Sequence, residues 1–387
     1  MGDRALTYDL VVVGLGAMGS ATLENAARRG LRVAGVEQFA RGHKLGGSHG
    51  KARMIRQAYF EDPAYVPLVL RAYELWRALE ERSGTRLLRT TGVLVAGRRE
   101  SAIVEGVLRS GAEHRLDIES FDAKELRRRY PMFRPLPDEV GVFEPAGGVL
   151  DPELSIEVQL DAAAQAGAAT MFEARIVGWK EKNGGFECAL ADGSTLSARK
   201  LALCNGSWLP ELVPELEDTI EVRRKIQIWF APRSSKFAVG RCPPFLLDRP
   251  ALGEAMYAFP DFGDGVKAAF HTGGERVAPD AVERSVRDEE IAPVREALNA
   301  WAPGAAGEVR AASVCFYDMT PDEHFLVGFA KGDPRVVVAG GFSGHGFKFA
   351  PAIGEIVVDL ATGGGTRHEI GFLNPTRFNA AGSSAGT

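Results

Sequence analysis

The segment Tyr8–Gly19, with the sequence YDLVVVGLGAMG, decides the fold. It begins as a nearly continuous apolar run with three valines, which is typical of a buried strand in a parallel sheet. It ends as Gly14-Leu15-Gly16-Ala17-Met18-Gly19, a G-x-G-x-x-G spacing that opens a stretch with helical character up to about Arg29. A second apolar run, Leu31–Val36, ends at Glu37 and completes one βαβ opening of ordinary length.

This order of strand, glycines and helix predicts a dinucleotide-binding site. The first glycine allows a tight turn, the second lets backbone approach a pyrophosphate, and the third permits close packing of helix on strand. The N-terminus of the helix offers unpaired N–H groups and a partial positive charge to the phosphates. Glu37 can accept hydrogen bonds from an adenosine ribose, and its charge would repel the extra phosphate of NADP. The motif by itself does not separate NAD from FAD.

Composition and charge indicate an ordinary globular protein. The chain has 387 residues, 45% of them hydrophobic and 25% charged, and this length favours two domains. The formal net charge of −5 argues against nucleic acid as a partner, so the basic clusters 127–129 and 223–225 are interpreted as solvated faces. No apolar run is long enough for a membrane span, and the N-terminus lacks the layout of a signal peptide. We therefore expect a cytoplasmic protein without a membrane partner.

The four cysteines, Cys188, Cys204, Cys242 and Cys315, are widely scattered. None forms a C-x-x-C pair, so the sequence predicts neither a metal site nor a disulfide framework. The ordinary interpretation of a lone cysteine is a small buried apolar residue, and we expect that for three of the four.

The rest of the chain alternates helical and strand-like segments. Helices are predicted at about 65–82, 151–167 and 350–360. Strand-like runs lie between 174 and 204 and at 336–339. The region from about 218 to 311 is interpreted as rich in strands and turns, with a hairpin around Asp264–Gly265. No linker separates these segments, which suggests domains that interleave.

Three further segments narrow the interpretation of the chain beyond the dinucleotide-binding motif. They are GGSHGKARMIR at 46–56, SVCFYDMTPDEHF at 313–325 and GGFSGHGFKF at 340–349. Together with the glycine motif they closely resemble the family of monomeric sarcosine oxidase and N-methyltryptophan oxidase, within the larger group typified by D-amino-acid oxidase. The resemblance runs from about Tyr8 to Phe378 with few apparent gaps.

The resemblance implies an α/β fold in which a Rossmann-like FAD-binding domain interleaves with a substrate domain built on an antiparallel sheet (α+β). The expected FAD-binding domain is discontinuous and covers residues 1–85, 148–217 and 312–380. The expected substrate domain covers residues 86–147 and 218–311, and residues 381–387 form a tail.

The resemblance also implies how the substrate is held. Arg56 and Lys348 match the family's carboxylate clamp, and a carboxylate in a partly buried cleft needs such charge-assisted partners. Lys348, just before the last predicted helix, would also stabilise negative charge on the pyrimidine side of the flavin. Tyr257 and Tyr317 match positions that line the substrate cavity, where aromatic rings exclude water.

Four residues match the family's catalytic positions. His49 and Arg53 fall where the family places residues against the flavin face and in its charge network. Lys267 matches the lysine that activates O₂, where a buried cation stabilises superoxide-like charge. His271 matches the neighbouring active-site histidine, and in a strand it would share a face with Lys267, with Ala269 between them.

The implied cofactor is FAD, with Cys315 as the thiolate joined to the flavin 8α-methyl carbon. No metal is expected. The residues implied to contact FAD lie in the glycine motif, the loop before residue 49, the segment around 206 and the loop around 345. They are Gly14, Gly16, Ala17, Met18, Gly19, Glu37, Gln38, Lys44, Gly47, Ser48, Arg53, Ile176, Cys204, Gly206, Trp208, Cys315, Phe342, Gly344, His345, Gly346, Phe347 and Lys348.

The implied function is oxidation of an N-methyl or other secondary α-amino acid by O₂, giving an imine and hydrogen peroxide, with formaldehyde from an N-methyl group. The expected partners are this small substrate and O₂, and the protein is expected to be a monomer. The alternatives are an oxidase of a cyclic imino acid (pipecolate or proline) or a sugar-modified amino acid, a flavin dehydrogenase with another electron acceptor, and a non-catalytic scaffold. Ser48 replaces a histidine of the best-known members, and Phe60 replaces a usual glycine, so substrate size and preference stay open.

Overall fold

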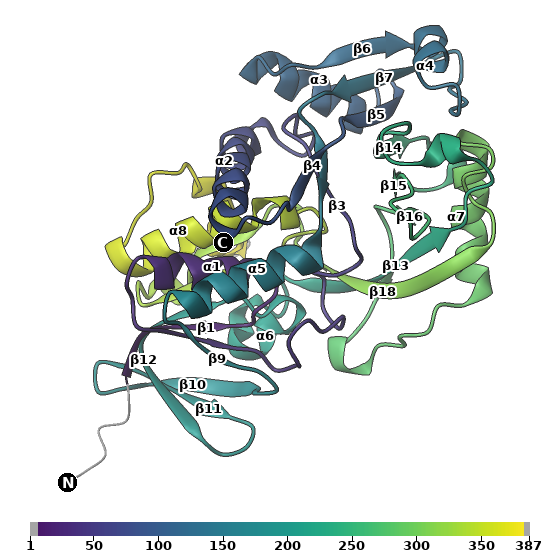
Figure 1. The fold of residues 1–387 in the computed structure, drawn as a ribbon. Helices are drawn as coiled ribbons and strands as arrows, with labels where there is room; N and C mark the ends of the chain where they lie inside the picture. Colours follow the sequence, from purple (N-terminus) through teal and green to yellow (C-terminus); the bar gives the residue numbers. More distant parts are fainter. Residues whose placement is uncertain (1–6, 383–387) are drawn as a thin grey trace.

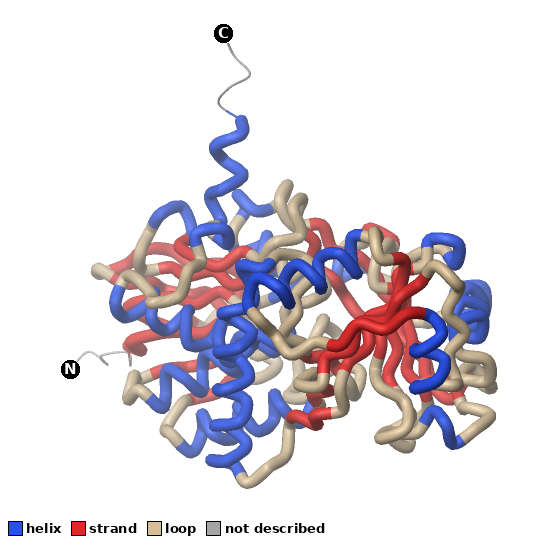
Figure 2. Tube along the Cα trace, turned by 90° about the horizontal axis from the view of Figure 1, so that it is seen from above, coloured by secondary structure: helices blue, strands red, loops and turns tan. Residues whose placement is uncertain are grey.

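The computed structural model describes residues 7–382, which form two large β-sheets and one small sheet. The two large sheets lie side by side, with most of the long helices around the first (Figures 1 and 2). The short strands β3 (Arg53–Ile55) and β4 (Leu88–Thr90) lie between them and pair with β8 (Gly148–Leu150). The first residues of the expected FAD-binding domain and most of the expected tail lie outside the described residues.

The first sheet has eight described strands, and β1 (Thr7–Val13) lies at its centre. β1 pairs in parallel with β2 and β12, and both of its faces are buried. Leu10 and Val12 pack against helices on one face, while Val11 and Val13 pack into a separate cluster on the other. This two-sided burial explains the continuous apolar run. The other strands are β2 (Val33–Val36), β9 (Ala169–Met171), β10 (Ile176–Lys182), β11 (Gly185–Leu190), β12 (Thr195–Leu203), β19 (Leu326–Phe329) and β20 (Val336–Gly340).

Three helices cover one face of this sheet (Figure 1). α1 (Ala17–Arg28) lies between α5 (Pro152–Gln165) and α8 (Ala350–Gly363), and α2 (Val66–Ser83) packs against α8. The carboxylate of Asp151 accepts a hydrogen bond of 3.0 Å from the backbone N–H of Leu154 and so caps α5. The N-terminus of α1 has no such side-chain cap from its N-cap residue Gly16.

The second sheet has nine described strands and is mostly antiparallel. The long strands β13 (Glu221–Phe230) and β18 (Val309–Met319) form one side of it (Figure 1). Helix α7 (Asp288–Trp301) covers one face, where Leu298 and Trp301 pack against Ile228. The other strands are β5 (Val93–Arg98), β6 (Glu119–Asp122), β7 (Glu139–Glu144), β14 (Phe245–Asp248), β15 (Met256–Phe259), β16 (Val266–Phe270) and β17 (Glu275–Arg276). The remaining helices are α3 (Ala102–His114), α4 (Ala123–Arg129) and the single turn α6 (Leu209–Leu212).

Most of the elements predicted from the sequence are confirmed. The βαβ opening, the hairpin β15–β16 and the helices α2, α5 and α8 lie where expected. The interpretation of 218–311 as strands and turns was wrong for α7, a helix of 14 residues. Pro293 inside α7 suggests a break, yet it removes only one hydrogen bond, and three acidic residues favour the helix N-terminus.

The division into two domains stays a prediction. All strands of the eight-stranded sheet lie within the segments expected for the FAD-binding domain. The expected boundary at residue 312 falls inside β18, which pairs with β13 in the nine-stranded sheet. Among residues 7–382, no helix is both long and apolar enough to cross a membrane.

Candidate active site

A long cavity opens at the C-terminal ends of the parallel strands in the first sheet. It holds about 1530 Å³ of space, part of it open to solvent. Its wall combines the glycine motif, the end of β2, the segment 204–208 and the loop 342–347. Open α/β sheets bind ligands at this edge of their strands.

The glycine motif brings strand and helix into close contact at one end of this cavity. Gly14 has a φ of +82°, and a Cβ on it would lie 2.5 Å from the Cα of Asn205. A Cβ on Gly19 would lie 1.7 Å from the carbonyl oxygen of Gly14. No other residue fits these two positions, so the sequence motif has its structural cause here. Ser48 lies beside the same turn, where its hydroxyl accepts a hydrogen bond of 3.2 Å from the N–H of Ala17.

Glu37 is a buried carboxylate on the cavity wall. Burial alone would raise its pKa, but hydrogen bonds from His43 and from the N–H groups of Leu15 and Phe39 outweigh it and lower the pKa. Glu37 is therefore ionised at neutral pH and acts as a hydrogen-bond acceptor.

A second cavity of about 700 Å³ adjoins the first. The two share wall residues at Arg53, Tyr317, Gly344 and Phe347. The second cavity lies between the loop 340–349 and the face of the nine-stranded sheet that α7 leaves free. A ligand in the first cavity can therefore meet a small molecule in the second.

Arg56 is the central cation of the second cavity, and it is 4% exposed. Its Nη2 donates to both carboxylate oxygens of Glu61, at 3.0 and 2.7 Å. Burial would raise the pKa of Glu61, but the charge and hydrogen bonds of Arg56, together with the charges of nearby basic groups such as Lys348, outweigh burial and lower that pKa to about 2. The rings of Tyr59 and Phe60 each lie 4.5 Å from the guanidinium carbon and fix its position.

Lys348 is the second buried cation at this end of the cavity. Its Nζ donates to the carbonyl of His345 at 2.7 Å and to the hydroxyl of Tyr59 at 3.3 Å. Burial, and then the charge of Arg56, lower the pKa of Lys348 to about 7. A bound carboxylate would raise that pKa again and hold the lysine as a cation.

A chain of hydrogen bonds fixes Lys348 from behind. The Nε2 of His345 lies 3.0 Å from the carbonyl oxygen of Glu323, which can only accept, so Nε2 carries the proton. Burial lowers the pKa of His345 to about 3, so the ring is neutral and its Nδ1 is an acceptor. The hydroxyl of Tyr59 therefore donates to Nδ1 at 2.5 Å, which leaves its oxygen to accept from Lys348.

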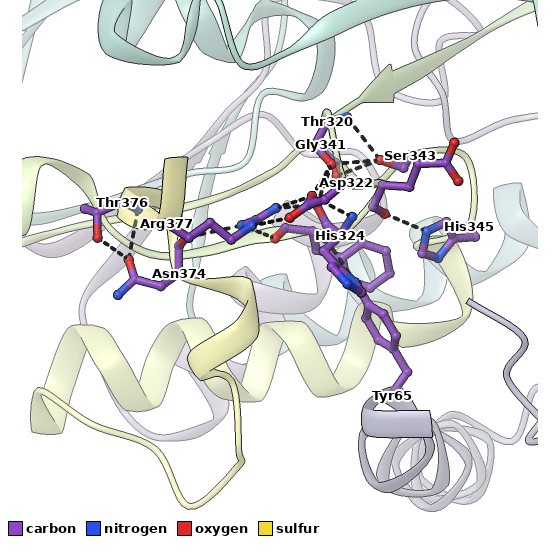
Figure 3. A network of polar contacts seen from close by, with 12 residues as sticks. Tyr65, Thr320, Asp322, His324, Gly341, Ser343, His345, Asn374, Thr376 and Arg377 are labelled. Carbon is purple, nitrogen blue, oxygen red and sulfur yellow. Dashed lines mark hydrogen bonds and ion pairs between the residues drawn. The ribbon is translucent and has the colours of Figure 1, made fainter. Parts of the chain in front are cut away.

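The segment that contains the carbonyl of Glu323 is held by hydrogen bonds to the C-terminal part of the chain (Figure 3). Arg377 donates to both carboxylate oxygens of Asp322, at 2.8 and 2.9 Å. The N–H of Thr320 donates to the hydroxyl of Ser343 at 3.2 Å, which joins the end of β18 to the glycine-rich loop.

His271 and two tyrosines form the opposite part of the wall. Burial, and then the positive charges of Lys225, Arg56 and Lys348, lower the pKa of His271 to about 4, so the ring is neutral at pH 7. The His271 ring lies 5.9 Å from that of Tyr317 and 6.4 Å from that of Tyr257. Burial raises the pKa of Tyr257 to about 12.

Cys315 lies on β18 where the two cavities meet, and it is 2% exposed. The Nη2 of Arg53 is 3.7 Å from its sulfur, and the carbonyl of Gly47 is 3.6 Å away. Burial raises the pKa of the other three cysteine thiols, Cys188, Cys204 and Cys242, to about 12.

Lys267 and His49 lie behind the cavity walls. Both are 2% exposed, and neither side chain forms part of a wall. The Nζ of Lys267 donates to the carbonyls of Gly50 and Ala52, at 2.8 and 2.9 Å. Burial, and then the charge of Arg53, lower the pKa of Lys267 well below its usual value. The same two causes lower the pKa of His49 to about 4.

The structure brings most of the predicted site residues together. Of the residues predicted for catalysis or substrate binding, the second cavity is lined by Arg53, Arg56, Tyr257, His271, Tyr317 and Lys348. Three residues predicted to contact the cofactor line this second cavity and not the first, namely Cys315, His345 and Lys348. The predicted cofactor residues on the first wall are Gly14, Gly16, Ala17, Met18, Glu37, Gln38, Gly47, Ser48, Arg53, Ile176, Cys204, Gly206, Trp208, Phe342, Gly344, Gly346 and Phe347. Gly19 and Lys44, like His49 and Lys267, lie on neither wall.

Three polar residues on the wall of the second cavity were missed by the sequence analysis, namely Glu61, Lys225 and Gln227. The interpretation of 223–225 as a solvated face was wrong, because Arg224 and Lys225 are only 7% and 6% exposed. They point to opposite faces of β13, with Arg224 paired to Glu290 near α7 and Lys225 in the second cavity. The alternation of Lys225 and Gln227 with isoleucines was the available signal, because a strand turns alternate residues to one face.

Comparison with known proteins places this architecture among the flavin-dependent oxidoreductases. The family described as FAD dependent oxidoreductase matches residues 9–360, and the chain belongs to that family. A monomeric sarcosine oxidase from Streptomyces avermitilis is 40% identical over 97% of this chain and 99% of its own length. An N-methyl-L-tryptophan oxidase from Yersinia pestis is 32% identical over 96% of this chain and all of its own length.

A solved structure supports the same fold. It is the open form of NikD, an unusual amino acid oxidase essential for nikkomycin biosynthesis. It has a TM-score of 0.84 and 25% sequence identity, and the match covers 95% of this chain and 97% of that one.

The first cavity fits the FAD that this family uses. The N-terminus of α1 and the close approach of backbone at Gly14 suit a pyrophosphate. Asn205 lies on the same wall, and its buried Oδ1 has no hydrogen-bond partner among the described residues. The residues of the first wall could therefore hold FAD.

Proposed function

We propose that this protein is an FAD-dependent oxidase of N-methyl α-amino acids, similar to sarcosine oxidase. The observation that carries the proposal is the pair Arg56–Lys348, two buried cations on the wall of a small cavity that adjoins the FAD cavity. Their nitrogen donors suit an α-carboxylate, which they would hold with its amine toward the shared wall. When bound, FAD accepts the hydride equivalent from the carbon next to nitrogen and passes two electrons to O₂.

The remaining wall residues prepare the substrate and exclude water. The neutral ring of His271 offers a hydrogen-bond acceptor and adds no charge that would repel the amine. Tyr257, Tyr317 and Phe60 close the cavity with aromatic rings, which keep water from the imine. Behind the wall, Lys267 in its cationic form would stabilise the negative charge that O₂ develops as it is reduced.

The test of this function is the stoichiometry of the products. The purified protein with sarcosine and air should release formaldehyde and hydrogen peroxide in equal amounts, with glycine as the amine product. If the protein oxidised glycine without forming formaldehyde, or released peroxide only with proline or pipecolate, its substrate would not be an N-methyl amino acid.

We also propose that Cys315 carries the flavin covalently, through a thioether to the 8α-methyl carbon. This rests on the buried sulfur where the two cavities meet and on the guanidinium of Arg53 beside it. Further parts of the proposal rest on the family resemblance alone, namely a monomer, a cytoplasmic location and the two-domain division.

Replacing Cys315 by alanine should abolish covalent flavin. After acid precipitation, the flavin of the wild-type protein should stay with the pellet, while that of Cys315→Ala should pass into the supernatant. Cys204→Ala, which removes another buried thiol on the first wall, is the control and should keep the bond. Covalent flavin in the Cys315→Ala protein would place the attachment elsewhere.

Replacing Phe60 by glycine should widen the substrate range. Phe60 lies over Arg56 and edge-on to His271, with ring centroids 6.3 Å apart, so its ring takes up space beside the substrate. The ratio of kcat/KM for N-methyltryptophan to that for sarcosine should rise by about tenfold or more in Phe60→Gly, since steric exclusion from a packed site costs about 1–3 kcal/mol. An unchanged ratio would show that Phe60 does not set substrate size.

A further inference from the structure

Lys225 is a buried cation in the second cavity that the proposed chemistry does not use. It is 6% exposed and lies on β13, opposite Cys315 in the register with β18. Its Nζ donates to the backbone carbonyls of Thr272 and, at 3.1 Å, Gly273. An ammonium group has three N–H donors, so one remains for a ligand in the cavity.

No carboxylate within the described part of the chain forms an ion pair with Lys225. Glu254 is the acidic group that acts on its charge, but it lies beyond ion-pair distance. Burial lowers the pKa of Lys225 to about 8, so it is still mainly a cation at pH 7. A buried cation without an anionic partner is costly for the fold, and such groups mark functional sites.

The excess of basic side chains on the wall of the second cavity also favours an anionic ligand. Among the described residues, the basic side chains of arginine and lysine on this wall are Arg53, Arg56, Lys225 and Lys348, and its one carboxylate is that of Glu61. Glu61 neutralises Arg56, and Arg53 lies beside Cys315 and donates to the carbonyl of Gly47 at 2.9 Å. The α-carboxylate of an amino acid would meet Lys348 and Arg56. Lys225 then still lacks an anion.

Lys225 is separate from the carboxylate clamp but lines the same cavity, so both can contact one ligand. His271 lies near both Lys225 and the clamp, because the charges of Lys225, Arg56 and Lys348 all lower the pKa of its ring. The Nζ of Lys225 lies 5.4 Å from the ring centre of Tyr317, which also lines the substrate cavity. A substrate fixed at the clamp can therefore extend its side chain past these rings toward Lys225.

We propose that Lys225 is a specificity-determining residue that binds a second carboxylate, so that the preferred substrates are N-methyl amino acids with acidic side chains. This inference rests on the proposed oxidase function and names the substrate class of the same site. A charge-assisted hydrogen bond in a buried cavity is strong enough to separate an acid from the amide of the same shape.

The test compares pairs of substrates that differ only in that charge. In the wild-type protein, kcat/KM for N-methyl-L-glutamate or N-methyl-L-aspartate should exceed that for the matching N-methyl glutamine or asparagine by about tenfold or more. In Lys225→Met the ratio should fall toward one. Lys236→Met, which removes an exposed lysine that lines neither cavity, is the control and should keep the wild-type ratio.

A binding experiment tests the same contact without turnover. Glutarate should perturb the visible flavin spectrum of the holoprotein at about tenfold lower concentration than glutaramate, the monoamide that keeps only one of the two carboxylates, and Lys225→Met should remove this difference. Acid-to-amide ratios near one for both glutamate and aspartate in the wild type, with sarcosine still oxidised, would overturn the role of Lys225 alone. An equal loss with all substrates in Lys225→Met would also overturn it, since the lysine would then only anchor the loop 272–273.

Failure of the oxidase function gives a different pattern. In that case neither sarcosine nor any acidic N-methyl amino acid reduces the flavin, whatever residue stands at 225. The comparison of glutarate with glutaramate would still decide whether Lys225 binds a carboxylate.

Discussion

Replacing Arg56 by methionine should lower kcat/KM for sarcosine by about 10²- to 10³-fold, mainly through a higher KM. The substitution removes the buried guanidinium that we assign to the substrate carboxylate. It also leaves Glu61, with its side chain 7% exposed, as a buried carboxylate without its partner. That orphaned charge should destabilise the protein by about 3–5 kcal/mol.

The double variant Arg56→Met/Glu61→Gln separates the two effects. It removes both charges of the pair, so most of the stability measured by urea unfolding should return. The catalytic defect should remain, because the substrate still lacks its cation. A wild-type KM for sarcosine in the double variant would show that Arg56 does not bind the substrate.

Replacing Lys267 by methionine should slow the reaction of the reduced holoprotein with O₂ by about 10²- to 10³-fold. Lys267 is a buried cation whose described hydrogen bonds go to two carbonyls, so its charge is not neutralised locally. Its removal should affect the anaerobic reduction by substrate much less. Stopped-flow measurement of the two half-reactions gives both rate constants, and equal losses in both would contradict a role specific to O₂.

The rate constant with O₂ should also depend on pH in one direction. Because burial lowers the pKa of Lys267, its cationic form is lost as pH rises through that lowered value, and the rate constant should fall with it. The decline should be absent in Lys267→Met. Lys51→Met is the matched control, because Lys51 lies next to the same backbone segment but is exposed and paired with Asp264.

Local sequence patterns were sufficient for the FAD cavity. A Cβ on Gly14 or Gly19 would lie less than 3 Å from neighbouring backbone atoms, so both positions require glycine, and this requirement is visible in the sequence. The apolar run of β1 likewise reflects burial on both faces. Each of these patterns lies within one short segment, Tyr8–Gly19, so one sequence is enough to recognise it, although Gly14 packs against the distant Asn205.

The substrate cavity depends on neighbours that are distant in the chain. Lys225 occurs within three consecutive basic residues, and only the pairing of β13 with β16 and β18 shows which face it occupies. Glu61 lies five residues after Arg56, but its ion pair exists because Tyr59 and Phe60 fold around the guanidinium. The position of Lys267 behind residues 50–52 also follows from tertiary packing.

The central claim is that the protein oxidises an N-methyl amino acid bound in the second cavity, next to the FAD cavity. Anaerobic reduction of the flavin by the substrate tests this claim most directly. Sarcosine, added without O₂ to the purified yellow holoprotein, should abolish the visible absorbance of the oxidised flavin. Admission of air should restore the spectrum and release hydrogen peroxide. An unchanged oxidised spectrum with saturating sarcosine, N-methyltryptophan and the acidic N-methyl amino acids would contradict the account, even if proline or pipecolate reduced the flavin.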